Sequence, residues 1–223
     1  MADKFMQSED GFKKKEQKKR VARKITQSYL QNSGLYYLQR YAASESHFKS
    51  VMARKIDRSL TDHPSLDKNQ CLEWLDEVAE KFVKAGYLND ERYATGLLQS
   101  LQIKGRSQKQ IQGRMRHAGV AADIIERVMQ ARFAEMAERI DTSELPSNWP
   151  LNTANLSEYI AALKCARKRR VGPFEHLSAQ SKPHDKALAM MARNGFSYDI
   201  AQTILATDKN EAEDIMILAR SLF

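Results

Sequence analysis

The sequence predicts an all-α protein, an elongated array of three tandem three-helix repeats of helix-turn-helix type followed by a C-terminal helix. From Ile25 onward, apolar residues recur at the three- and four-residue spacing of amphipathic helices, and no segment alternates as a strand would. Nine glycines and five prolines in 223 residues leave few helix breakers. Short patterns also return at fixed offsets, which is typical of repeat proteins.

The first repeat is defined by caps and breaks. One amphipathic helix ends near Ala43, and Ser44 is placed to cap a second helix. The second helix ends at the His63-Pro64 break, and Asp67 caps a third that Gly86 ends.

The second and third repeats follow the same order. Asn89 or Asp90 caps a helix that ends at Gly105, and Ser107 begins the next, which Gly119 ends before a long helix. Beyond two prolines, further helices are expected at about 156–170, 185–194, 197–206 and 208–222, with a long loop over 170–183. The expected units are a basic, disordered arm (1–24), repeats at 25–86, 87–140 and 154–206, a linker at 141–153 and a C-terminal helix at 207–223.

Internal similarity supports this division. The pattern Met115, Gly119, Asp123, Ile124 returns 76 residues later as Met191, Gly195, Asp199, Ile200. A weaker copy relates Ser44, Phe48 and Met52 to Ser107, Ile111 and Met115 at an offset of 63, with Ile56 in place of the turn glycine. Units of this size are near the lower limit for an independent hydrophobic core. Neighbouring units are therefore expected to stack and to bury apolar surface against one another.

Composition restricts the possible functions. The net charge of +8 and the pI of about 9.4 favour an anionic partner, with nucleic acid as the first candidate. The sequence contains no Gly-rich phosphate loop, HExxH or CxxC pattern, so we expect no enzyme, metal or cofactor. With only two cysteines the chain cannot form a disulfide framework, so we expect a cytoplasmic protein. No apolar run is long enough for a membrane-spanning helix.

Basic side chains gather around the second helix of the middle repeat and at the end of the first helix of the third. On an elongated array these could form one stripe that contacts a negative polymer or an acidic groove, although solvated faces would have the same composition. The candidate contacts for a partner protein or DNA are Lys104, Arg106, Lys109, Arg114, Arg116, Arg167, Lys168, Arg169 and Arg170.

Aromatic residues fall on or beside the apolar stripes, and we expect them in the core rather than on the surface as stacking platforms. The third helices carry few base-reading residues at their N-termini, which favours a structural over a DNA-reading role for the helix-turn-helix pattern. The expected core aromatics are Tyr36, Tyr37, Tyr41, Trp74, Phe82, Tyr87 and Tyr93.

Several separated stretches form a recognisable set: Tyr37–Glu45, Gly86–Ala94, Lys104-Gly105 with Ser107 and Gly119-Val120, and Gly195–Ile200. Together they resemble the bacterial RecX regulatory protein family. The likeness extends over about residues 30–206 and departs in the lysine-rich arm, at Ile56 and over 170–183.

The resemblance implies a tandem three-helix-repeat modulator of the RecA recombinase. Such proteins lie in the groove of the RecA–DNA filament, hinder its growth and damp its ATPase, strand-exchange and co-protease activities. We expect a monomer that contacts the filament, and direct contact with DNA remains open. A stand-alone helix-turn-helix DNA-binding protein and a passive helical scaffold for another acidic protein remain as alternatives.

Overall fold

The structure is a computed structural model that describes residues 21–139, 153–175 and 184–221. In these ranges it contains ten α-helices and no strand, which confirms the all-α class. Residues 1–20 of the expected arm (1–24), 141–152 of the expected linker (141–153) and 176–183 of the expected loop (170–183) lie outside the described residues. No described helix combines the length and the apolar character that crossing a membrane requires.

Three helices form the first group: α1 (Gln27–Leu38), α2 (Glu45–Asp62) and α3 (Lys68–Lys84). Their apolar faces meet in a cluster that includes Phe48, Met52 and Phe82, with the two phenylalanine rings 5.6 Å apart. Helix α1 approaches closely because Gly34 has no side chain: a Cβ there would lie 2.7 Å from the Phe82 ring.

The second group has its own cluster. Helices α4 (Asp90–Ile103), α5 (Gln108–His117) and α6 (Ala122–Arg139) enclose buried residues that include Leu98, Ile111 and Met115. Helix α5 is much shorter than α2, because the chain turns at Gly119, whereas α2 continues through Ile56 to the His63 break.

The third group contains four helices: α7 (Thr153–Arg169), α8 (His184–Arg193), α9 (Tyr198–Ala206) and α10 (Lys209–Leu218). They surround a third cluster that includes Ile160, Met191 and Ile204. A short 3₁₀ turn, Gly172–Phe174, packs on this group, so part of the expected loop is regular, and a second 3₁₀ turn, Ala219–Ser221, follows α10.

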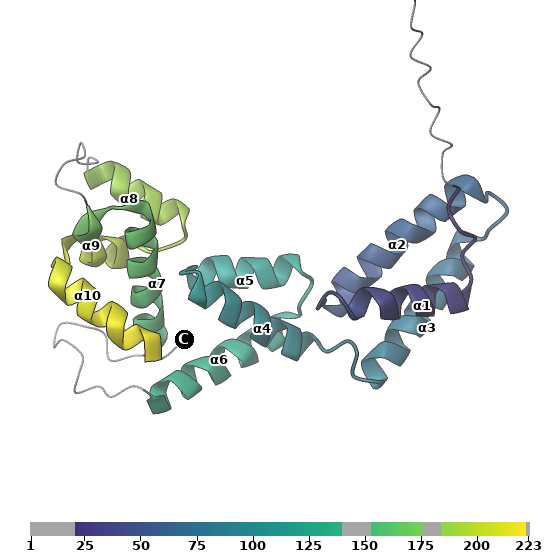
Figure 1. The fold of residues 1–223 in the computed structure, drawn as a ribbon, viewed down its shortest axis with the longest axis horizontal. Helices are drawn as coiled ribbons and strands as arrows, with labels where there is room; N and C mark the ends of the chain where they lie inside the picture. Colours follow the sequence, from purple (N-terminus) through teal and green to yellow (C-terminus); the bar gives the residue numbers. More distant parts are fainter. Residues whose placement is uncertain (1–20, 140–152, 176–183, 222–223) are drawn as a thin grey trace, which may run out of the picture.

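The three groups follow one another along the longest axis of the molecule (Figure 1). Helix α6 packs against α7 and so connects the second group to the third. The expected N-caps Ser44, Asp67 and Asn89 are confirmed, since each side chain accepts a hydrogen bond from a first-turn backbone N–H.

Consecutive groups meet in a polar contact that occurs twice. In the first joint, Ser44 Oγ donates to the carbonyl of Ala118, and the Glu45 N–H donates to Asp90 Oδ1 at 2.8 Å. The start of α2 is thereby attached both to the α5–α6 turn and to the start of α4.

The second joint repeats these contacts one group further along. Ser107 Oγ donates to the carbonyl of Asn194 at 2.7 Å, and the Gln108 N–H donates to Glu158 Oε2 at 2.7 Å. Both capping serines are fully buried. Because the partners are fixed backbone and carboxylate oxygens, each joint sets how one group meets the next.

Candidate partner-binding surface

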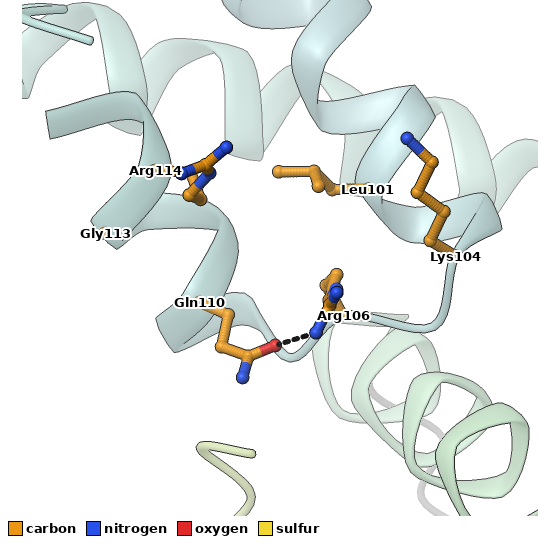
Figure 2. Close-up of a pocket in the computed structure, with 6 residues that line it drawn as sticks. All are labelled: Leu101, Lys104, Arg106, Gln110, Gly113 and Arg114. Carbon is orange, nitrogen blue, oxygen red and sulfur yellow. Dashed lines mark hydrogen bonds between the residues drawn. The ribbon is translucent and has the colours of Figure 1, made fainter. Parts of the chain in front are cut away.

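Three of the predicted basic residues lie around one hollow of about 560 Å³ beside the α4–α5 turn, which we call the basic hollow (Figure 2). Lys104 and Arg106 flank the turn, and Arg114 reaches the hollow from α5. Arg106 lies within 3.5 Å of Gln110 Oε1 and so borders the hollow from the turn. All three cations are exposed, so a negative partner can reach them.

The other two candidates of this group do not line the basic hollow. Arg116 lines a separate hollow between α5 and α6, together with Phe133. Lys109 faces the α8–α9 turn, because its Cβ lies 3.4 Å from where a Cβ on Gly195 would be. Helical spacing directs these side chains away from Arg114, so the five predicted residues do not form one patch.

The basic residues at the end of α7 lie close to the basic hollow. Burial raises the pKa of the Cys165 thiol, while the positive charges of Arg169, Arg106 and Lys168 lower it. Charges act on a group this way only from nearby. Arg106, on the turn between α4 and α5, is therefore a neighbour of the α7 terminus, and the two predicted clusters adjoin across the second joint.

Arg167 and Arg170 complete the α7 cluster. The guanidinium of Arg167 lies 6.0 Å from the centre of the Phe174 ring, near the limit of a cation–π contact. Arg170 follows the last residue of α7 and adopts the left-handed conformation with φ of 53°. Helices α3, α4, α5 and α8 have a glycine at this position, which is the unstrained choice.

Replacing Arg170 with glycine is expected to raise the free energy of unfolding by about 1 kcal/mol, because a side chain in the left-handed region costs about that much. The same change removes one positive charge and should weaken binding to an anionic ligand such as a single-stranded oligonucleotide. Urea denaturation and a binding titration measure the two effects. Arg170→Ala is the matched control: it removes the charge but keeps a Cβ. Equal stability of the glycine and alanine variants would contradict the assignment of strain.

Gly113 exposes the backbone of α5 where the helix borders the basic hollow. A Cβ at this position would contact nothing within 4 Å, so packing does not require glycine. Glycine in a helix interior costs about 1 kcal/mol relative to alanine. A partner that approaches the helix backbone would explain why the position has no side chain.

Gly113→Ala is therefore expected to raise the free energy of unfolding by about 0.5–1 kcal/mol, while Gly113→Met, which fills the hollow, reduces partner binding. Gly96 in α4 is the matched control, because a Cβ there also meets nothing. Gly96→Met should leave partner binding unchanged. Loss of binding in both methionine variants would show that the hollow is not the cause.

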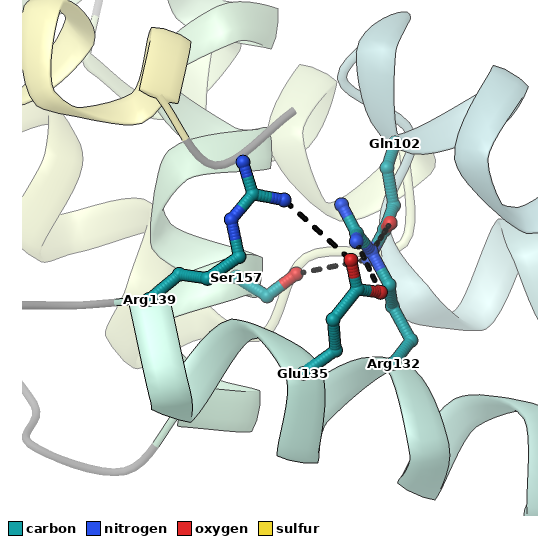
Figure 3. A network of polar contacts seen from close by, with 5 residues as sticks. All are labelled: Gln102, Arg132, Glu135, Arg139 and Ser157. Atoms are coloured by element: carbon teal, nitrogen blue, oxygen red, sulfur yellow. Dashed lines mark hydrogen bonds and ion pairs between the residues drawn. The ribbon is translucent and has the colours of Figure 1, made fainter.

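A network of polar side chains connects three helices from the second and third groups (Figure 3). Buried Arg132 on α6 donates through Nε to Gln102 Oε1 at 3.1 Å, and Gln102 lies 3.4 Å from Ser157 Oγ on α7. Arg132 also pairs with Glu135 at 2.7 Å, and this hydrogen bond holds the pKa of Glu135 below its usual range. The network ties α4, α6 and α7 together beside the second joint.

Glu158 makes the second joint sensitive to pH. Burial raises its pKa to about 7, although the hydrogen bond from the Gln108 N–H acts in the opposite direction. In the unfolded chain a glutamate has a pKa near 4.3. Between this pH and about pH 7 the folded protein binds more protons than the unfolded chain, so the free energy of unfolding falls as the pH rises.

Glu158→Gln keeps an acceptor for Gln108 but cannot ionise. At pH 8 we expect this variant to be more stable than the parent by about 1–3 kcal/mol, with the difference disappearing below about pH 4. Denaturant unfolding across this pH range measures the effect. A pH-independent difference between the two proteins would contradict it.

Three of the aromatic residues expected in the core are on the surface. Tyr36, Tyr41 and Tyr87 are more than half exposed, so the prediction was wrong for them. Each lies near a helix end, where the apolar stripe continues past the packed part of the helix. The sequence spacing alone could not distinguish these positions from buried ones.

The described residues contain no cluster of three or more His, Cys, Asp or Glu side chains able to hold a metal ion. Cys71 and Cys165 are buried, and burial raises the pKa of both thiols, which keeps them protonated and unreactive. The described surface presents positively charged side chains, exposed tyrosines and, at Gly113, helix backbone that no side chain covers.

Comparison with known proteins adds independent information. The chain is 35% identical over 201 residues to regulatory protein RecX of Myxococcus xanthus (strain DK1622), covering 90% of this chain and 95% of the relative. It is 29% identical over 193 residues to regulatory protein RecX of Agrobacterium fabrum, covering 85% and 88%. No family model and no solved structure matches. Likeness of this extent to a full-length relative shows that the chain belongs to the RecX family of regulatory proteins.

Proposed function

We propose that this protein binds the RecA recombinase and its filament on DNA and lowers the activity of that filament. The affected activities are ATP hydrolysis, strand exchange and co-protease function, so filament growth in recombination and the SOS response is limited. The protein acts as a cytoplasmic monomer through binding alone, without catalysis or a cofactor. The observation that carries the proposal is the likeness to RecX proteins over nine-tenths of the chain.

We further propose that the three helix groups are tandem repeats of one three-helix unit, over 25–86, 87–140 and 154–206, with a linker at 141–153 and a C-terminal helix at 207–223. The two joints support this division, because the same serine-to-carbonyl and N–H-to-carboxylate contacts recur between successive groups. Units joined in the same way each time could contact successive protomers of a regular polymer.

The mechanism follows from repetition. If each unit contacts a successive RecA protomer, several weak contacts act together through effective concentration. Bridging adjacent protomers restrains the motions that ATP turnover needs or obstructs addition at a filament end. The basic hollow and the Arg167–Arg170 cluster are the proposed contacts for phosphates or for acidic protein surface; Lys109 and Arg116 are proposed to contribute from other faces.

Steady-state ATP hydrolysis by the cognate RecA on single-stranded DNA, titrated with this protein at two salt concentrations, tests the proposal. We expect inhibition well below one copy per recombinase, weaker at high salt because phosphate contacts release counterions. Absence of inhibition at saturating, folded protein would overturn it.

The alternative of a stand-alone helix-turn-helix DNA-binding protein is less well supported. Helices α6 and α9, which would read bases, carry Asp123 and Asp199 in their first turns, and a carboxylate there repels the phosphate backbone. A DNA sequence bound specifically without recombinase would favour this alternative.

A further inference from the structure

A second hollow, chemically unlike the basic one, lies between the end of α1 and the start of α4. It measures about 360 Å³, and we call it the tyrosine hollow. The lining residues that characterise it are Arg40, Tyr41, Tyr87, Asn89, Arg92 and Tyr93. None of the described residues that line it is acidic.

The tyrosines are exposed yet held in place. Tyr41 and Tyr87 each have 58% of their surface exposed. The Tyr41 ring lies 5.3 Å from the Tyr37 ring, and the Tyr87 ring packs edge-on against Phe82 at 5.8 Å. Rings fixed in this way lose little conformational entropy when a partner covers them.

The two arginines are also pre-positioned. Arg92 donates to the carbonyl of Gly86 at 2.6 Å, and the guanidinium of Arg40 lies 4.4 Å from the centre of the Tyr36 ring. No carboxylate lines the hollow, so none of its lining residues neutralises these two positive charges. A negatively charged group on the partner would supply the complement.

The combination of residues favours a protein over a nucleic acid. Tyrosine and arginine are the residue types that dominate binding energy at protein interfaces, where lysine is depleted. The tyrosine hollow has three tyrosines, two arginines and no lysine, whereas the basic hollow has Lys104 and no aromatic side chain. The two sites lie at opposite ends of α4, since Arg92 and Lys104 are separated by about 18 Å of helix.

We propose that the tyrosine hollow binds a protein segment of the recombinase in which a carboxylate lies beside an apolar side chain. This inference rests on the proposed function and assigns a different binding partner to each of the two hollows. The tyrosine hollow recognises protein, and the basic hollow recognises phosphate.

The test measures binding to two partners separately: cognate RecA immobilised without DNA, and a fluorescein-labelled single-stranded oligonucleotide without RecA. The double variant Tyr41→Ala with Tyr87→Ala is expected to lose at least tenfold in affinity for RecA and less than twofold for the oligonucleotide. Tyr198→Ala is the matched control, because Tyr198 is 63% exposed on α9 and far along the chain. Tyr41→Phe with Tyr87→Phe keeps the rings and should retain most of the RecA affinity.

The outcomes are distinguishable. If the alanine variant keeps its RecA affinity, the tyrosine hollow is not the protein contact. If it loses oligonucleotide affinity instead, the hollow takes bases and the proposal is overturned. If the parent protein binds no RecA and does not inhibit it, the proposed function itself fails. Thermal unfolding of each variant establishes that the alanine protein is folded, and the phenylalanine pair supplies the comparison if it is not.

Discussion

Reversing both arginines of the basic hollow, Arg106→Glu with Arg114→Glu, is expected to weaken inhibition of the recombinase ATPase at least tenfold. The pair lies with Lys104 around one hollow, so four units of charge change at a single place. If each arginine neutralises a phosphate of the single-stranded DNA, the slope of log affinity against log salt should become shallower by about 1.4. The titration at several salt concentrations measures both quantities, and circular dichroism checks that helix content is unchanged.

The control makes an equal charge change elsewhere. Lys81 and Lys84 lie in the last turn of α3 and are exposed, so Lys81→Glu with Lys84→Glu alters net charge by the same amount. Long-range electrostatics alone would weaken inhibition equally in both variants. Only a loss confined to the arginine pair supports the basic hollow as the contact.

Gly195→Ala is expected to lower the free energy of unfolding by about 2–4 kcal/mol, since two penalties add. The backbone at Gly195 is left-handed with φ of +87°, and a Cβ there would lie 2.5 Å from Ser107 Oγ. The serine would have to move, breaking its hydrogen bond to Asn194 and its cap on α5. The variant should also lose inhibition, because the angle between the second and third groups changes.

Gly86→Ala separates the two penalties. Gly86 is also left-handed, with φ of +75°, but a Cβ there meets nothing within 4 Å. It should cost only about 1–2 kcal/mol and leave inhibition intact. Chemical denaturation of the pair measures the difference. Equal losses in the two variants would mean that the second joint contributes nothing.

The sequence allowed the local structure to be predicted, because local signals determine it. Ser44, Asp67 and Asn89 cap helices as expected, and Gly86, Gly105, Gly119 and Gly195 end them. Arg170 could not be identified in this way, since nothing in its neighbours indicates a left-handed residue other than glycine. It lies between α7 and the 3₁₀ turn Gly172–Phe174, which packs back against α7.

The contacts between helix groups could not be predicted from the sequence. The internal similarity selected Ser44 with Ser107 and Gly119 with Gly195, as members of separate patterns. That the serine of one group meets the glycine turn of the next is a contact across 74 or more residues, which no periodicity encodes. For the same reason, the gathering of Lys104, Arg106 and Arg114 without Arg116 required the structure.

The three separate hydrophobic clusters have a consequence for how the molecule opens. The first two clusters each lie within one helix group, whereas the third also contains Met136 of α6. The second and third groups further share the α6–α7 packing and the Arg132 network, and the first group is attached mainly at its joint. In repeat-like arrays, stability is a sum of local and nearest-neighbour terms. Amide hydrogens should therefore exchange in blocks, with residues 21–86 opening as one unit while the remainder stays protected. If the protein is bound to a polymer through several helix groups, one group could detach while the others stay bound. Dissociation would then proceed in steps rather than in a single event.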